Sequence, residues 1–408
     1  MKLFNTDTET QVFRNRDSLQ DDYVPDELAG DTRDDEMQQL ATALQPIITG
    51  DQPDNVLVRG PNGSGKTAAV RVVLNILDYE IESIEGVNFS YVIVNGSQHN
   101  TGYQLTRDLA NKLHPDTDFR QGHSYSALLN AVAEGIKGLD GAVVVAIDEL
   151  SDIDDVDKLL YLLTRSSSND ALAGKQMGVV ATTTDASFKN ELSPHVKSTI
   201  GKRTVKFDAY TSNQLREVLN HRVEKAFAEG SVDESAISLC AALATQQGGD
   251  ARFALDLLKY GGDIANRGDG RVTETEINQA NDMWAREHVD SIVSDFSLKE
   301  RQVLCAYMEL REVADVTSPR TAQIVRRYQT LAGRSKSAEV VSDRTVARYL
   351  QSLVDEGLLR STLHQDKEGT WREYEPAFDS IHYLDALRSD VDRDKIAPHE
   401  DLVSVIKQ

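Results

Sequence analysis

The sequence predicts an α/β fold in which a parallel sheet is followed by an all-helical section and then by three helices and a β-hairpin. Three observations support this. Short apolar runs alternate with helical patterns up to residue 208, which is typical of a parallel sheet. From Thr211 to Ile292 only helical patterns occur, and strand patterns return near residue 358. We expect an α/β domain with an acidic N-terminal segment at residues 1–208, a helical lid at 209–292, a third domain at 293–388 and a polar tail at 389–408.

A glycine-rich stretch organises the first domain. It fits the phosphate-binding pattern G-x-x-x-x-G-K-[ST] and reads Gly60-Pro61-Asn62-Gly63-Ser64-Gly65-Lys66-Thr67. A short apolar strand pattern precedes it and a helical pattern that starts at Ala68 follows, as this P-loop motif requires. Glycines let backbone N–H groups close around a polyphosphate, and the helix N-terminus adds partial positive charge. We expect Lys66 to reach the β- and γ-phosphates, Thr67 to bind Mg²⁺, and Ala68 to belong to the same nucleotide-binding set.

Upstream of the P-loop, a helix is expected over residues 34–48, with its apolar residues on one face. Before it stands the turn Tyr23-Val24-Pro25. Its position suits a flap on the adenine side of the nucleotide, so Val24 and Pro25 are candidate binding residues. The alternative is a simple entry loop.

Two further strands are expected to bring polar groups to the edge where ligands bind in such sheets. After a strand at 89–95 and helices at 102–113 and 124–136, the apolar run 142–147 ends in Asp148-Glu149, the Walker B pattern. Asp148 would hold Mg²⁺ through water, and Glu149 would polarise the water that attacks the γ-phosphate. The strand starting at Met177 ends near Thr184, which could orient that water. A last strand is expected at 203–207.

The helical section is expected to contain helices at 213–229, 234–247, 251–266 and 274–292, forming a small bundle or lid. Arg252 stands at the start of the third helix, after Gly248-Gly249-Asp250-Ala251. From there it could reach a γ-phosphate across the domain cleft. The alternative is a surface arginine in a first helical turn.

The third unit has the order of a winged helix: helices at 299–311, 321–331 and 344–355, a strand at 358–360, a turn at 367–370 and a strand at 371–374. Residues 318–360 carry eight bases and four acids, a local charge of +4. Arg344 and Arg348 are one helical turn apart, which suits a recognition helix in a major groove. The alternative is a solvated face in a protein-binding winged helix. The candidate DNA-binding residues are Arg344, Thr345, Arg348, Lys367 and Arg372.

Overall charge favours a salt-accumulating microbe. The chain has 66 acidic and 44 basic residues, a net charge of −22, with Arg preferred over Lys. An ordinary acidic cytosolic protein is the alternative. Acidity argues against a nucleic-acid partner in dilute salt, but at molar salt the Debye length falls to about 3 Å and local charge matters more.

Composition predicts a soluble, cytoplasmic protein without a membrane partner; its association with the nucleoid is an expectation from the family resemblance given below. No run approaches 18 uncharged apolar residues, and Met1 to Arg16 lacks an apolar signal core. Cys240 and Cys305 lie far apart within helical apolar patterns, so we expect core thiols instead of a disulfide or metal site.

With these motifs in order, the chain resembles the archaeal origin-recognition/cell-division-control AAA+ initiators, relatives of the eukaryotic origin recognition complex subunits. The resemblance covers nearly the whole chain. It rests on Val12-Phe13-Arg14-Asn15, Asp22-Tyr23-Val24-Pro25, Gly60–Thr67, Val94-Asn95 with Thr101, Asp148-Glu149, Tyr161–Arg165, Phe207–Tyr210, Gly249–Arg252 and Ser342–Leu358.

The resemblance implies a replication initiator that binds ATP or ADP with Mg²⁺, binds double-stranded origin DNA and helps recruit the minichromosome maintenance helicase, with other initiator paralogues as further partners. It identifies Arg252 as the sensor-2 arginine, and we place Tyr210 and Arg222 in the nucleotide-binding set. It also suggests that the insertion near His99 to Ser124 touches DNA.

The chain departs from the family pattern at three places. Thr184 stands where the family has its sensor-1 asparagine, and Ser151 stands where it has a second aspartate after Asp148-Glu149. The wing shows Lys367-Glu368-Gly369-Thr370-Trp371-Arg372 in place of a tip rich in glycine and arginine. These departures leave open the rate of ATP hydrolysis and the DNA sequence that is bound, and with them whether the origin served is a main, secondary or plasmid origin.

From the sequence we therefore expect an initiator in which ATP is a slow switch, with weak ATPase activity. Two alternatives stay open: a clamp-loader-like or helicase-like AAA+ ATPase with fast turnover, and a winged-helix regulator in which ATP is structural. The oligomeric state and any trans-acting arginine are not visible in the sequence.

Overall fold

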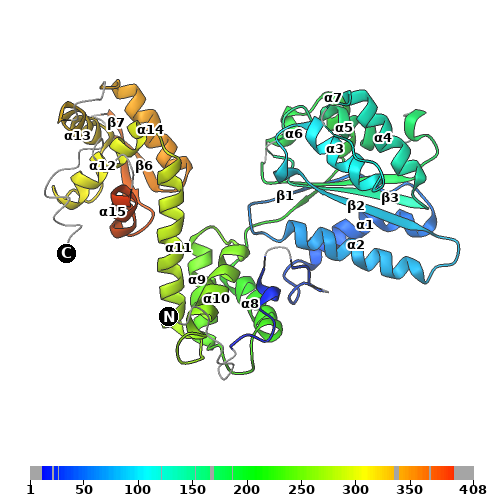
Figure 1. Cartoon of the computed structure of the whole chain (residues 1–408), viewed down its shortest axis with the longest axis horizontal. Helices are drawn as coiled ribbons and strands as arrows, with labels where there is room; N and C mark the ends of the chain where they lie inside the picture. The colour runs from blue at the N-terminus through cyan, green and yellow to red at the C-terminus, as the bar shows by residue number, and fades with distance from the viewer. Residues whose placement is uncertain are drawn as a thin grey trace. The chain divides into compact units, whose positions relative to one another are not determined.

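The computed structural model (Figure 1) describes residues 12–20, 23–25, 27–120, 122–151, 153–165, 170–185, 187–334, 340–366 and 369–389. The chain divides into two compact units, Met1–Ile277 and Asn278–Gln408. Each unit is described by itself below.

A five-stranded parallel sheet forms the centre of the first unit, with the strand order β2-β3-β4-β1-β5. The strands are β1 Val56–Arg59, β2 Phe89–Asn95, β3 Ala142–Asp148, β4 Met177–Thr183 and β5 Arg203–Lys206. Asn95 pairs with Asp148, and Arg59 pairs with Thr183. This register brings the carboxyl ends of β1, β2, β3 and β4 to one edge of the sheet, where the sequence places its candidate site.

Helices cover both faces of the sheet (Figure 1). Alternate residues of a strand point to opposite faces, so Val56, Val58 and Val144 pack with one helix layer while Leu57 and Val143 pack with the other. The first layer consists of α1 Asp34–Leu44 and α2 Lys66–Glu82; the second contains α3 Gly102–Leu113, α4 Tyr125–Gly138, α5 Asp157–Thr164 and α7 Pro194–Ile200. Burial on both faces explains the unbroken apolar sequence of β3.

Several short helices were not predicted from the sequence: α5, α6 Phe188–Glu191, α7 and, in the second unit, α15 Ser380–Ser389. None has more than ten residues, and the residue before α5, Val156, makes no side-chain cap. The helix expected over 34–48 also differs, because its α-helical part ends at Leu44 and Gln45–Thr49 forms a 3-10 helix containing Pro46. Within the described ranges, 3-10 helices also occur at Arg16–Leu19, Gly96–Gln98 and Asp170–Leu172.

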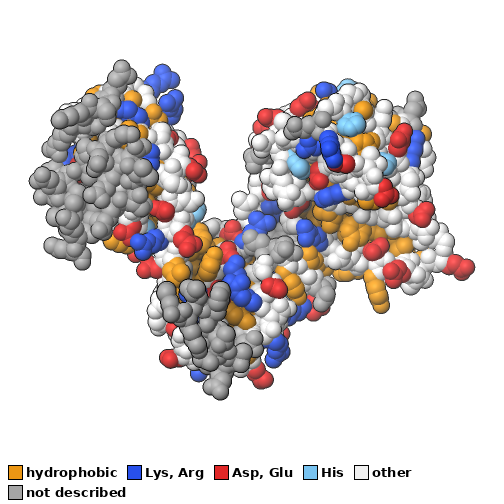
Figure 2. All heavy atoms as spheres, in the orientation of Figure 1, with side chains coloured by type: hydrophobic (Ala, Val, Ile, Leu, Met, Phe, Trp, Pro, Cys, Tyr) orange, Lys and Arg blue, Asp and Glu red, His pale blue; other side chains and the backbone are white. Residues whose placement is uncertain are grey.

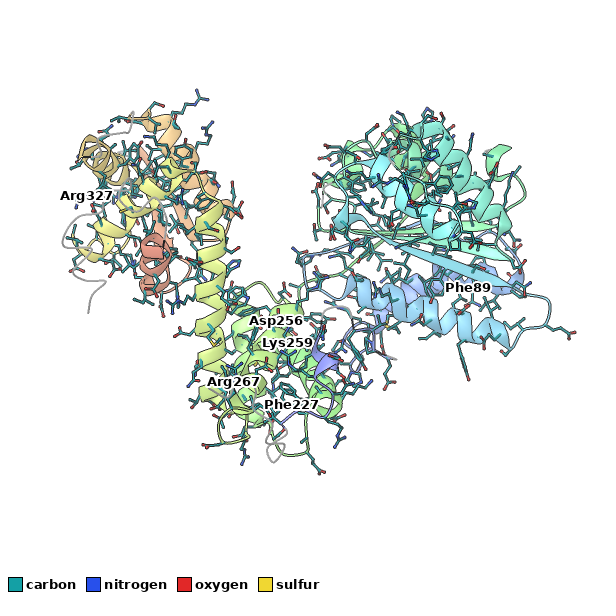
Figure 3. The ribbon with its side chains drawn as sticks, in the orientation of Figure 1. Phe89, Phe227, Asp256, Lys259, Arg267 and Arg327 are labelled. Carbon is teal, nitrogen blue, oxygen red and sulfur yellow. The ribbon has the colours of Figure 1, made fainter. Side chains whose placement is uncertain are left out.

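The lid section of the first unit contains α8 Ser212–Ala226, α9 Glu234–Gln246 and α10 Ala251–Ala265. The N-terminal segment packs on these helices. Phe13 lies 4.8 Å, centroid to centroid, from Phe227, which Figure 3 labels, and the Arg14 N–H donates to the Ala226 carbonyl at 2.8 Å. Figure 3 also marks Asp256 and Lys259, an ion pair on α10. The lid therefore combines the N-terminal segment of the first unit with the helices at its C-terminal end.

The second unit has the winged-helix arrangement that the sequence predicts. Within α11 Glu274–Asp295 the chain passes from the first unit to the second, and α12 Leu298–Glu312, α13 Thr321–Arg334 and α14 Asp343–Asp355 follow. Strands β6 Leu359–Asp366 and β7 Gly369–Pro376 form an antiparallel hairpin. The strand expected over 358–360 is thus longer than predicted. Tyr307, Tyr328 and Tyr383 are fully buried in this core.

Both cysteines are buried and free, Cys240 in α9 and Cys305 in α12. Burial raises the pKa of the Cys240 thiol to about 12 and also raises the pKa of Cys305. Both groups therefore remain neutral thiols at physiological pH, as expected for core residues.

One charge of the second unit lies in its interior. Glu309 on α12 is completely buried, and Arg327 on α13, labelled in Figure 3, donates from Nε to its carboxylate at 2.6 Å. Arg327 is one of the eight bases counted in the sequence, so part of that positive charge neutralises the core.

We expect Arg327→Met to lower the free energy of unfolding of the second unit by about 3–5 kcal/mol, because it removes the guanidinium that pairs with the buried Glu309 carboxylate. Urea denaturation in molar salt measures this. Adding Glu309→Gln should recover most of the loss, and Arg326→Met, at an exposed position on the same helix, is the control. A loss below about 1 kcal/mol in Arg327→Met would contradict the assignment.

Candidate functional site

A cavity of about 360 Å³ lies in the first unit at the carboxyl edge of the sheet. Its size is within the range of small-molecule sites. The P-loop, the Walker B acids, the N-terminal flap and the lid all contribute to its wall. The lining residues are Gln20, Tyr23, Val24, Pro25, Leu28, Ala29, Thr32, Asn62, Gly63, Ser64, Gly65, Lys66, Thr67, Ala68, Arg71, Asn95, Ser97, Asp148, Glu149, Thr184, Tyr210, Val218, His221, Arg222, Ala251, Arg252 and Leu255.

The P-loop requires glycine at the two positions where its backbone is left-handed. Gly63 has φ of +63° and Gly65 has φ of +88°. A Cβ on Gly65 would stand 2.4 Å from the Tyr210 hydroxyl oxygen, and one on Gly63 would overlap the Asp250 carboxylate. The loop thus has room for backbone only, the geometry in which N–H groups can surround an anion.

Lys66 opens α2 and is buried, with 6% of its surface exposed. Its Nζ donates to the carbonyl oxygens of Gly60 and Pro61, each at 2.8 Å. Burial lowers the pKa of Lys66, while the carboxylates of Glu149 and Asp148 oppose that shift. Gly60 and Pro61 do not line the cavity. They contact it indirectly, because their carbonyl oxygens accept hydrogen bonds from Lys66.

Thr67 and Asp148 lie in direct contact at the base of the P-loop. The Thr67 hydroxyl donates to the two carboxylate oxygens of Asp148 at 2.8 and 3.0 Å, and Thr182 donates to Asp148 at 2.7 Å. Hydroxyl and carboxylate oxygens are the hard ligands that Mg²⁺ prefers, so this pair fits the metal expected with ATP. Beside it, Arg71 Nε is buried without a hydrogen-bond partner among the described residues, which leaves a donor at this end of the cavity.

Glu149 follows β3 with φ of +58°, an uncommon value for a residue other than glycine. Its N–H donates to the Thr182 hydroxyl at 2.8 Å. Its carboxylate accepts from Ser151 at 2.5 Å and from the Thr184 hydroxyl at 3.2 Å. The Walker B glutamate is therefore fixed through both its backbone and its side chain, and strain of this kind is typical of functional sites.

The start of α10 brings the lid onto the P-loop. The Ala251 N–H donates to the Gly63 carbonyl at 3.1 Å, and the Asp250 side chain caps the helix by accepting from the Arg252 N–H at 2.8 Å. Arg252 is exposed and lines the cavity, and its charge acts on Lys66. The structure thus brings the predicted sensor-2 arginine and the P-loop into one site.

The predicted flap forms another part of the cavity wall. Tyr23, Val24 and Pro25 line it together with Arg222. The Arg222 guanidinium lies 4.7 Å from the centre of the Tyr23 ring and donates to the Ser18 carbonyl at 3.2 Å. Burial lowers the pKa of Arg222 and raises that of Tyr210. This wall of aromatic, aliphatic and cationic groups suits a nucleobase.

Sequence reasoning missed several residues of the cavity. Arg71 lies one helical turn after Thr67, and this spacing could have indicated it. His221 precedes Arg222; burial lowers its pKa, and the charges of Lys225 and Arg222 lower it further. Other lining residues that were missed include Gln20, Thr32, Ser97, Leu28, Ala29, Val218 and Leu255.

The second candidate surface is the exposed face of α14. Arg344 and Arg348 are exposed, while Val346, Leu350 and Leu353 are buried on the opposite face. Neither arginine makes an ion pair within the part of the chain that the structure describes. Figure 2 shows basic side chains standing out from the part of the second unit that Figure 1 draws as α14. The face is therefore available to a polyanion.

The remaining DNA-binding candidates differ from one another. Thr345 is half-buried and shares a hydrogen bond with the Ser342 hydroxyl at 2.9 Å. Arg372 on β7 donates to Gln351 of α14 at 2.9 Å, so the wing and the helix meet at this residue. Lys367 lies outside the described residues.

The local charge of +4 overstates the cationic surface. Arg320 pairs with Glu373 at 3.0 Å and lies over the Trp371 ring at 4.6 Å, and Arg327 pairs with the buried Glu309. Glu373 also lies 3.2 Å from His364, which stacks on Trp371. The wing is thus held by an aromatic and ionic cluster. Of the counted bases in the described ranges, Arg344 and Arg348 on α14, Arg326 on α13 and Arg360 on β6 are exposed, as is the paired Arg320.

We expect Gly65→Ala to weaken nucleotide binding at least tenfold, because the added Cβ meets the Tyr210 hydroxyl and the left-handed backbone is strained. Gly50→Ala is the matched control, since Gly50 has φ of +74° but no atom within 4 Å of the added Cβ. Titration with a fluorescent ATP analogue checks both variants. Equal losses in the two would show that backbone strain alone is responsible.

Comparisons with known proteins agree with this architecture. A family model described as the AAA ATPase domain matches residues 31–174, and one described as the Cdc6 AAA+ ATPase-type lid domain matches residues 216–282. ORC1-type DNA replication protein 8 of Halobacterium salinarum is 34% identical over 387 residues, which are 92% of this chain and 96% of that protein. ORC1-type DNA replication protein 1 of Aeropyrum pernix is 33% identical over 395 residues, 95% of this chain and 98% of that protein.

Among solved structures, the Aeropyrum pernix ORC1 protein in complex with DNA is similar, with a TM-score of 0.73, 32% identity and coverage of 94% of this chain and 98% of that one. The Aeropyrum pernix ORC2 protein, at 19% identity and a TM-score of 0.63, shares the fold. The AAA ATPase and Cdc6-type lid models therefore match this chain one after the other, and the chain covers nearly the whole length of these relatives. The chain belongs to the family of ORC1-type DNA replication proteins.

Proposed function

We propose that this chain is a replication initiator in which ATP, clamped between the sheet and the lid of the first unit, controls how the winged helix holds origin DNA. The observation that carries the proposal is the cavity lined jointly by Lys66, the Walker B acids and Arg252. A triphosphate there would touch the sheet domain and the lid at once. Loss of the γ-phosphate would then change the contacts between them.

The proposed nucleotide contacts follow from the geometry. Lys66 would exchange its carbonyl partners for β- and γ-phosphate oxygens. The P-loop N–H groups would surround the phosphates, and Val24, Pro25, Tyr210 and Arg222 would hold the base end. Thr67 and Asp148 would hold Mg²⁺, which neutralises charge on the phosphates during transfer.

Hydrolysis in this proposal is slow and depends on Glu149. Water attacks the γ-phosphorus, the bond to the β,γ-bridging oxygen breaks, and Glu149 accepts a proton from the attacking water. The products are ADP and inorganic phosphate. Arg252 would stabilise charge on the γ-phosphate from the lid, so cleavage would remove one tie between lid and P-loop.

DNA binding would use α14 and the wing. The support is the exposed pair Arg344 and Arg348, the contact of Arg372 with α14, and a similar relative solved in complex with DNA. This chain has an excess of acidic residues, and similar proteins occur in Halobacterium and Haloarcula. Both observations fit a salt-rich cytoplasm. In such salt, phosphate contacts lose affinity steeply. Base-edge contacts by the arginines and DNA shape would then carry most of the specificity.

The proposed partners beyond DNA are the minichromosome maintenance helicase and other initiator paralogues, and the proposed location is the cytoplasm, at the nucleoid. No helix among the described residues is both long and apolar enough to cross a membrane. A clamp-loader-like ATPase would need fast turnover, and a winged-helix regulator would bind promoters without the helicase. Genome-wide mapping of bound DNA distinguishes an initiator from the regulator.

We expect Lys66→Ala to abolish measurable ATP retention in a filter assay, because the variant loses the cation of the P-loop. The winged helix should remain folded, since it belongs to the other compact unit. Near-UV circular dichroism of the tyrosine-rich core checks that point. Unimpaired ATP retention would refute the proposed clamp.

We expect Arg344→Ala to cost about 1–3 kcal/mol on the preferred origin sequence and much less on random duplex of equal length. Arg326→Ala is the charge-matched control, because Arg326 is exposed on α13 instead of α14. Fluorescence anisotropy across a series of salt concentrations measures both affinities. If Arg344→Ala weakened both duplexes equally, Arg344 would only contact phosphates.

A further inference from the structure

Ser151 has no role in the nucleotide site assigned so far, yet it stands at the centre of a cluster of hydroxyl groups around Glu149. It lies outside the cavity lining, behind Glu149 and Thr184, both of which line the cavity. Its Oγ is 2.9 Å from the hydroxyl oxygen of Thr184 and 2.9 Å from that of Thr183. These residues join the loop after β3 to the end of β4.

The hydrogen atoms of this cluster can be assigned by counting donors and acceptors. A hydroxyl group has one hydrogen and two lone pairs. Ser151 donates its hydrogen to Glu149 Oε1 at 2.5 Å, and its oxygen accepts from the Thr184 N–H at 3.0 Å. The Asp185 N–H lies 3.3 Å from Ser151 Oγ and 3.1 Å from the hydroxyl oxygen of Thr183. Because the hydrogen of Ser151 is committed to Glu149, Ser151 can only accept in its contact with the Thr184 hydroxyl.

The hydrogen of the Thr184 hydroxyl is therefore directed into this cluster. The acceptors within its reach are Ser151 Oγ at 2.9 Å and Glu149 Oε1 at 3.2 Å, and both belong to the group of atoms that holds the glutamate. Thr184 thus presents lone pairs to the cavity instead of a hydrogen. A group in this state can accept from a water molecule, but it cannot donate to a phosphate oxygen.

We propose that Ser151 is a positioning residue for ATP hydrolysis: it orients Glu149 and turns Thr184 into a second support for that carboxylate instead of a donor to the γ-phosphate. This inference rests on the hydrolytic switch proposed above. The two departures from the family pattern, at Ser151 and at Thr184, then form one functional unit. Glu149 Oε1 is held by Ser151 and Thr184, while Oε2, which makes no hydrogen bond within the described ranges, is left for the attacking water.

The test compares Ser151→Ala, Thr184→Val and Thr184→Ser with the wild type, by single-turnover hydrolysis and by displacement of a fluorescent nucleotide. Ser151→Ala and Thr184→Val should each lower the hydrolysis rate about tenfold, because the general base loses an orienting donor. Thr184→Ser, which keeps the hydroxyl, should restore it. The double variant should lose well under a hundredfold, since both residues act through the same oxygen.

Affinity is the second measurement, and it separates positioning from phosphate contact. All variants should keep the wild-type ratio of ATP to ADP affinity. Ser90→Ala is the matched control, since Ser90 is near the opposite end of β2 and donates to the Asp140 carbonyl. Thermal melting of each variant verifies the fold.

The outcomes separate the inference from the proposed function. A rate for Ser151→Ala equal to or above that of the wild type would overturn the role of Ser151 alone. A selective loss of ATP over ADP affinity in Thr184→Val would show that Thr184 donates to the γ-phosphate, and it would overturn the role as well. ATP binding without turnover in the wild type would remove hydrolysis from the proposed function and this role with it.

Discussion

The arrangement of the nucleotide cavity depends on the Thr182 hydroxyl group. It donates to the Asp148 carboxylate at 2.7 Å and accepts the Glu149 N–H at 2.8 Å, so a single side chain of β4 fixes both acids that follow β3. Because β3 and β4 are neighbouring parallel strands, this contact requires their carboxyl ends to be in register. Thr67 then attaches the P-loop helix to the same carboxylate. The sheet, the P-loop and the acids are thereby connected through hydrogen bonds that a polar, partly buried site must satisfy.

Burial of charge is the second constraint. Lys66, Arg222 and Glu309 are all buried, and in each case the structure supplies polar partners: carbonyl oxygens for the two cations and a guanidinium for the acid. A buried ionic group without partners would destabilise the fold by several kcal/mol. The exposed acidic side chains do not change this requirement, because dissolved salt screens their charges much more than it screens buried charges.

Much of the architecture could be predicted from the sequence, because local pattern and motif carry that information. The strands β1 to β5, the P-loop and α14 follow from apolar periodicity and from residues of fixed chemistry. The short helices α5, α6, α7 and α15 could not be found in this way, since they extend for few turns and α5 has no capping side chain. Long-range partnerships were also hidden. Residue spacing and the number of charges in a segment do not show that Arg320 pairs with Glu373, that Arg222 lies on Tyr23, or that Ser151 faces Thr184.

The chain crosses between the sheet and the lid at two places, and Arg33 ties these crossings together. The first runs from the N-terminal segment on the lid through the flap to α1, and the second runs from β5 to α8. Arg33, at the start of α1, donates to the Asp208 carbonyl at 2.6 Å and lies 3.9 Å from the centre of the Tyr210 ring. A domain joined to its neighbour by one connecting segment can change its orientation in any direction. A domain joined by two segments that contact each other has fewer orientations open to it. Arg33 therefore restricts how far the lid can move relative to the sheet, and Arg252 lies on the part of the lid that lines the cavity.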